Sequence, residues 1–169
     1  MVAKKSDKSK KIWLLIVALI GVVLGGVLFV GAVSGWFSGP EMATIDAEYY
    51  CYDKCELELE VITPDEYEEM IQSGKSFVVF IDEGGCVTAN KMRDFAESFS
   101  NVNRFTIFKL FFEDLKEISL GEYVNYYPSV AVISRGRVIA WLRADSDEDA
   151  PAYNNFADFE EWMKKYIKL

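Results

Sequence analysis

Residues Ser76–Cys86, SFVVFIDEGGC, join an uninterrupted apolar run to two glycines and a cysteine. A short continuous apolar run is typical of a strand buried on both faces of a sheet. Apolar residues then recur at helical spacing between Met92 and Phe99. The stretch therefore predicts a buried strand, a glycine turn and a helix from about Cys86 to Phe99, with one cysteine where that helix begins.

The residues before this stretch predict a strand and a capped helix. Residues 57–62, LELEVI, alternate apolar and acidic side chains as a half-buried strand does. A capping box follows, in which Thr63 caps the helix, Pro64 fits its first turn and Glu66 completes the box. Gly74 is expected to end this helix.

The residues after it predict another strand and an irregular helix. Residues 104–112, RFTIFKLFF, are rich in β-branched and aromatic side chains, which favours a strand. Residues 113–127 are consistent with a short helix that is broken or loosely wound near Gly121.

A hairpin and a last helix complete the domain. The segments SVAVIS and RVIAWLR flank Arg135-Gly136, a two-residue turn signal, and so predict a β-hairpin. Residues 156–166 place their apolar side chains on one helical stripe. The predicted element order is βαβαβαββα, which indicates an α/β domain with a mixed central sheet.

This order resembles the thioredoxin fold, a three-layer α/β fold, over Val61–Leu169. SFVVFIDEGGC is similar to the family's central strand and active-site turn, and NYYPSVAVISRGRVIAWLRA to the segment in which a cis proline precedes two strands. Within that superfamily, ITPDEYEEMIQSGKSFVVFI followed by a cysteine is most similar to bacteriocin transport accessory proteins, which are small membrane-linked or secreted bacterial proteins.

The resemblance implies a peptide-binding groove beside Cys86. It implies a cis Tyr127-Pro128 bond, with Tyr127, Pro128, Val87 and Thr88 contacting an extended substrate and Cys86 as the nucleophile. No cofactor is implied.

Three residues depart from the family's pattern of two cysteines separated by two residues. Ala89 replaces the second cysteine, Gly85 replaces a tryptophan, and Phe80 replaces a buried acid that assists proton transfer. An ordinary dithiol reductase activity is therefore not expected.

A lone cysteine at a helix N-terminus still has a physical reason to react. Unpaired backbone N–H groups and the positive end of the helix dipole stabilise a thiolate. Asp82 and Glu83 lie close by in the sequence and oppose a further negative charge. One thiolate suffices to form a mixed disulfide, but releasing the substrate then needs a second thiol.

The remaining cysteines, Cys51 and Cys55, leave three interpretations open. They form a structural disulfide with each other, or one of them resolves Cys86, or they bind a metal. The metal is disfavoured because the chain has no histidine and structural zinc needs four ligands. The acidic loop Asp145–Asp149 lacks the spacing and glycine of a calcium-binding loop, so a solvated loop is expected.

The chain's first part predicts a membrane anchor. Residues 12–37 contain no charged residue. This uncharged stretch is longer than the roughly 20 apolar residues that a spanning helix needs. A lysine-rich stub, residues 1–11, precedes them, so the amino end is expected in the cytoplasm and the remaining chain outside. A cleaved signal peptide is the competing interpretation, but signal peptides usually have apolar cores of about 7–15 residues. Residues 38–60 are expected to be a juxtamembrane linker, and residues 61–169 the folded domain.

The net negative charge of the chain after the lysine-rich stub limits the kinds of partner that it can bind. From Ile12 onward, 26 acidic residues outnumber 13 basic ones, which makes nucleic acid and anionic lipid poor partners. Two hypotheses follow: an anchored protein that acts on thiols or disulfides of envelope or secreted proteins through Cys86, or a redox-inactive module that binds extracytoplasmic polypeptides. The single anchor and lysine-rich stub suit a bacterial cell membrane.

Overall fold

A computed structural model describes residues 39–53 and 56–169, and the compact unit within it runs from Pro40 to Leu169. The predicted stub and membrane span, residues 1–37, lie outside the described residues. Within the described ranges, no helix is long and apolar enough to cross a bilayer.

A five-stranded mixed sheet forms the centre of the unit, in the order β1-β3-β2-β4-β5. The strands are β1 (Glu60–Val61), β2 (Phe77–Asp82), β3 (Phe108–Phe111), β4 (Ser129–Ser134) and β5 (Arg137–Trp141). The central strand β2 runs parallel to β3 and antiparallel to β4. All six of its residues are buried: the apolar run predicts this for Phe77–Ile81, whereas the sixth residue is the charged Asp82.

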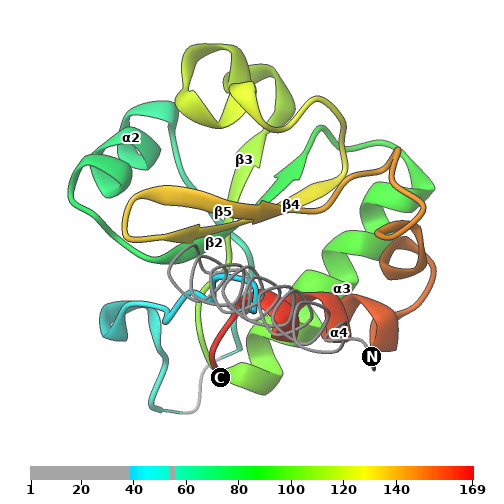
Figure 1. Ribbon diagram of the computed structural model, residues 1–169, viewed down its shortest axis with the longest axis horizontal. Coiled ribbons are helices and arrows are strands. Elements are labelled where there is room, and N and C mark those ends of the chain that lie inside the picture. Colours follow the sequence, from blue (N-terminus) through cyan, green and yellow to red (C-terminus); the bar gives the residue numbers. More distant parts are fainter. Residues whose placement is uncertain (1–38, 54–55) are drawn as a thin grey trace, which may run out of the picture. The chain divides into compact units, whose positions relative to one another are not determined.

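Helices cover both faces of the sheet and make three layers (Figure 1). On one face lies α2 (Pro64–Gln72), together with the 3-10 helices Phe112–Glu117 and Ser119–Glu122. On the other face lie α3 (Val87–Asn103) and α4 (Phe156–Tyr166). Alternate residues of β2 enter the two hydrophobic cores: Val78 and Phe80 pack toward α3 and α4, while Val79 and Ile81 pack toward α2.

Local signals account for the helix start and the hairpin. Thr63 Oγ1 accepts the Glu66 N–H, and Glu66 Oε2 accepts the Thr63 N–H at 2.7 Å, so the predicted capping box is present. Arg135 and Gly136 both have positive φ, 51° and 70°, as a type I′ hairpin turn requires.

Two elements are less regular than an α-helix and a full-length strand. The segment expected to be a short helix, broken or loosely wound near Gly121, forms two 3-10 helices, Phe112–Glu117 and Ser119–Glu122. A Cβ at Gly121 would lie 2.1 Å from the Leu115 carbonyl oxygen, so this tight winding depends on the glycine. The first strand is also shorter than residues 57–62, because only Glu60 and Val61 pair with β3.

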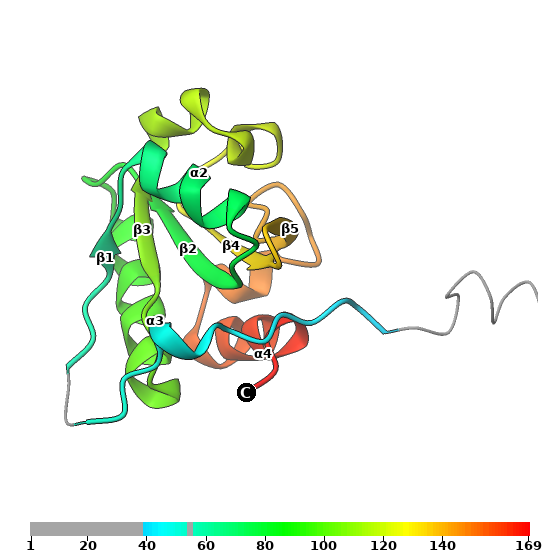
Figure 2. The same ribbon diagram turned by 90° about the vertical axis from the view of Figure 1, so that its left-hand side faces the viewer.

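The segment expected to be a linker packs onto the domain. Ala43 and Ile45 are buried, Ala43 forms a parallel bridge with Ile167, and Tyr50 forms an antiparallel bridge with Phe105. Figure 2 shows this segment, in cyan, beside α4. The compact unit therefore begins about twenty residues before the boundary expected at Val61, because long-range contacts rather than local periodicity order residues 40–53.

Candidate functional site

Cys86 occupies the N-cap of α3, at the position that the sequence predicts for the start of the helix. Its Sγ accepts the backbone N–H of Ala89 at 3.2 Å, and the residue is half-buried with a free thiol. Gly84 and Gly85 precede it with φ of 77° and 82°, which a residue with a Cβ rarely adopts. The glycine turn thus places one sulfur at the helix end where backbone donors are unpaired.

A buried ionic cluster underlies this turn. Asp82, the last residue of β2, is 0% exposed. Its Oδ1 accepts the Gly84 N–H at 2.8 Å, and its Oδ2 pairs with Arg93 of α3 and, at 3.4 Å, with Lys109 of β3. The carboxylate therefore ties the cysteine turn to two neighbouring elements.

The partners of Asp82 keep it ionised. Burial raises the pKa of this carboxyl, but the Arg93 guanidinium, the Gly84 amide and the Lys109 ammonium together hold it below its ordinary value. The sequence suggests that Asp82 opposes a thiolate at Cys86. In the structure two cations compensate the charge of Asp82, and Glu83 is exposed to solvent.

The Tyr127-Pro128 peptide bond is cis, as the resemblance implies. Ile81 pairs with Ser129, so this bond and the turn that leads to Cys86 lie at the same end of the sheet. Tyr127 is exposed, and its ring lies with its centroid 4.9 Å from that of Phe112, tilted by 49°. Val87 and Thr88, at the start of α3, are exposed as well. The strand register thus brings the predicted groove residues to the same end of the sheet.

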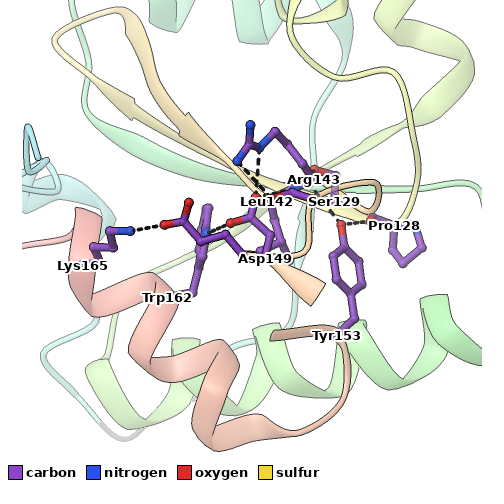
Figure 3. Close-up of polar contacts among 10 residues, drawn as sticks. Pro128, Ser129, Leu142, Arg143, Asp149, Tyr153, Trp162 and Lys165 are labelled. Carbon is purple, nitrogen blue, oxygen red and sulfur yellow. Dashed lines mark hydrogen bonds and ion pairs between the residues drawn. The ribbon is translucent and has the colours of Figure 1, made fainter. Parts of the chain in front are cut away.

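Hydrogen bonds fix the backbone on the other side of Pro128 (Figure 3). The Tyr153 hydroxyl lies 3.1 Å from the Pro128 carbonyl oxygen and 3.2 Å from that of Leu142, and it donates to both. Ser129 Oγ donates to the Leu142 carbonyl at 2.7 Å. The cis segment is therefore held against the end of β5 and the 3-10 helix Ala150–Tyr153.

Asp149 is buried and has a structural role, although the sequence predicts a solvated loop for Asp145–Asp149. It is 5% exposed, its Oδ2 accepts from the Arg143 backbone N–H and Nε, and its Oδ1 accepts from Trp162 Nε1 (Figure 3). The acidic side chains before it, Asp145, Asp147 and Glu148, are exposed. No cluster of three His, Cys, Asp or Glu side chains in the described ranges is arranged to hold a metal.

The structure excludes a disulfide between Cys51 and Cys86. Cys51 is disulfide-bonded, whereas Cys86 is a free thiol, so the partner of Cys51 is not Cys86. Cys55 lies outside the described residues. Ala89, in the place of a second active-site cysteine, is fully buried against the core.

The comparisons with known proteins define the class of fold. An oxidised thioredoxin from Plasmodium falciparum matches with a TM-score of 0.50 and 15% identity, over 64% of this chain and 97% of that one. Thioredoxin O2 from Arabidopsis thaliana matches with a TM-score of 0.50 and 13% identity, over 69% of this chain and all of the other. The compact unit has a thioredoxin-like fold. No family model matches the sequence, and no curated protein matches it.

Proposed function

We propose that this protein exchanges disulfides with other polypeptides through Cys86. The observation that carries the proposal is the free, half-exposed Sγ at the N-cap of α3, which accepts the Ala89 N–H at 3.2 Å. That position places the sulfur beside the unpaired backbone donors at the start of a helix. The thioredoxin-like fold supports the same chemistry, and the cis Pro128 segment supplies the neighbouring edge for an extended substrate.

The reaction starts and ends with a reduced Cys86. Its thiolate attacks one sulfur of a substrate disulfide, so that a bond forms between Cys86 and that sulfur while the substrate disulfide breaks. The departing substrate thiolate takes up a proton. A second thiol of the same substrate then attacks the mixed disulfide, forms a new substrate disulfide and releases Cys86. No net oxidant is consumed, which suits a site where Ala89 replaces the second cysteine.

Trapping of mixed disulfides tests this proposal. Intact cells are treated with a thiol-blocking reagent and their proteins are separated on non-reducing gels. We expect adducts that disappear on reduction and in Cys86→Ser, while Val102→Ser, an exposed change near the other end of α3, leaves them in place. An unchanged adduct pattern in Cys86→Ser would exclude Cys86 as the nucleophile.

We also propose that residues 12–37 anchor the domain outside the cytoplasm. The proposal rests on the uncharged span and on the lysine-rich stub before it. The protein should stay with the membrane fraction after alkaline washing, and protease added to spheroplasts should digest the thioredoxin-like domain. Release by alkali, or protection from protease until lysis, would contradict the anchor or its orientation.

A binding role without redox chemistry is the second candidate. It is favoured by exposed apolar side chains at the edge of the groove, with Val87 85% exposed and Tyr126 53% exposed. In this case Cys86→Ser retains its partner in a pull-down, whereas Tyr127→Ala loses it. Loss of the partner in Cys86→Ser would instead favour the disulfide-exchange role.

A further inference from the structure

A small pocket opens beside the cis proline segment, outside the cysteine site. It has a volume of about 150 Å³ and is lined by Tyr123 and Tyr126 from the segment before Pro128, and by Trp141, Arg143 and Asp145 from the end of β5 and the loop after it. Tyr126 is two residues from Pro128, so the pocket lies close along the chain to the cis segment.

Aromatic rings form one wall of the pocket. The rings of Tyr123 and Trp141 meet edge to face, with centroids 5.3 Å apart, and Tyr123 is 38% exposed. The faces of such rings carry negative potential and attract a cation placed within about 6 Å. This wall therefore suits a cationic side chain better than an anionic one.

The charged side chains that line the pocket favour the same ligand. Arg143 is the cation that lines the pocket, and Asp149 already holds it, with 3.1 Å between Nε and Oδ2. The carboxylate of Asp145 is exposed and forms no ion pair or hydrogen bond with any side chain in the part of the chain that the structure describes. Asp145, Glu148 and Asp149 all interact with Arg143, so acidic side chains outnumber the one cation that lines the pocket.

We infer that this pocket binds a lysine or arginine side chain of the polypeptide that lies along the Pro128 edge. The inference deepens the proposed function, on which it rests, because it names basic segments as the substrate class. The excess of acidic residues from Ile12 onward, 26 against 13 basic, attracts such segments over a longer range. The alkyl stem of the bound side chain packs on the tyrosine and tryptophan rings, and its charge faces Asp145.

Binding of cysteine-free peptides to the full-length chain tests the inference without involving Cys86. The probes are a fluorescent extended peptide with two lysines and the same peptide with both lysines replaced by glutamine. We expect the lysine peptide to bind about twofold to fivefold more tightly than the glutamine peptide, in line with a cation–π contact at an exposed site. Its Kd should rise with salt, because the screening length falls from about 10 Å at 0.1 M to about 3 Å at 1 M.

Two variants locate the binding in the pocket. Asp145→Asn and Tyr126→Ala should each abolish the preference for the lysine peptide, whereas the exposed neighbour Asp147→Asn, which does not line the pocket, should keep it. Equal binding of the two peptides, or an unchanged preference in both pocket variants, would overturn the inference. If Cys86-dependent adducts persist in Asp145→Asn, disulfide exchange stands without the pocket. If the wild type prefers the lysine peptide but Cys86→Ser leaves the adduct pattern unchanged, the inference about the pocket is supported and the proposed disulfide exchange is contradicted.

Discussion

At the end of β2, the carboxylate of Asp82 holds two cations and one backbone amide while it is shielded from water. Asp82→Asn keeps an oxygen for the Gly84 amide but leaves Arg93 and Lys109 without their counter-charge. Removing one partner of a buried ion pair costs about 3–5 kcal/mol. We expect the free energy of unfolding, measured by chemical denaturation, to fall by about 3 kcal/mol, since both cations keep some contact with water.

The exposed pair of Arg137 and Glu41 is the matched control for this change, with 2.9 Å between its charged atoms. Because exposed pairs contribute about 0–1 kcal/mol, Glu41→Gln should hardly alter the free energy of unfolding. Equal losses in the two variants would mean that Asp82 is not the anchor of a buried cluster.

The same carboxylate makes stability depend on pH. Its pKa in the folded protein lies below the ordinary value of 3.8, so the unfolded chain takes up a proton more readily. The stability that Asp82 contributes is therefore fully present above that ordinary value and is lost as the pH falls through the lowered folded pKa. The difference in unfolding free energy between the wild type and Asp82→Asn should shrink as the pH is lowered from about 6 to about 2. A constant difference over this range would contradict the proposed charge state.

Sequence patterns found the residues whose signals are local. Cys86 follows a buried strand and two glycines, and Pro128 precedes a hairpin, so both stand out along the chain. The cluster around Asp82 and the hydrogen bonds of Asp149 have no such pattern, because their partners lie on other helices and strands. Only the strand order β1-β3-β2-β4-β5 brings Lys109 beside Asp82.

Among the elements, the β4–β5 hairpin depends on a glycine that touches another part of the chain. Gly136 has φ of 70°, and a Cβ there would lie 2.2 Å from the carbonyl oxygen of Ile71 in α2. Gly136→Ala should therefore lose more than the roughly 1–2 kcal/mol that a left-handed conformation costs a residue with a Cβ, because the α2 backbone must also move. Thermal unfolding measures the loss.

Gly85→Ala is the control, since Gly85 has φ of 82° but nothing within 4 Å of an added Cβ. This variant should show the conformational cost alone. A larger loss in Gly85→Ala than in Gly136→Ala would mean that the contact with Ile71 does not limit the hairpin.

The same contrast explains which elements the sequence predicts. The capping box at Thr63 and the Arg135-Gly136 turn are set by neighbouring residues, and both are present. The length of β1 and the 3-10 winding around Gly121 are set by contacts: β1 is limited by its pairing with β3, and the winding by the carbonyl of Leu115. Hydrophobic periodicity carries no information on such contacts.

For the whole molecule, residues 40–53 extend the fold beyond the segment that resembles thioredoxin. A chain that begins at Glu56 should be clearly less stable than one that begins at Pro40, because Ile45 alone contributes about 1.5–3 kcal/mol through its burial. The midpoints of thermal unfolding of the two chains provide the measurement, and equal midpoints would show that the segment adds no stability. The sequence suggested a linker here because small and acidic residues dominate, whereas the partners that bury this segment lie near Phe105 and Ile167.

The bridge between Ala43 and Ile167 joins the beginning of the domain to its end. The Ala43 N–H donates to the Tyr166 carbonyl at 2.7 Å, and the Lys168 N–H donates to the Ala43 carbonyl at 2.8 Å. Any mechanical tension that arrives along the chain from residue 39 is resisted first by this clasp and by the buried Ile45. Because these contacts lie between residue 39 and the strand that leads to Cys86, a pull on that end strains them before it strains the cysteine turn.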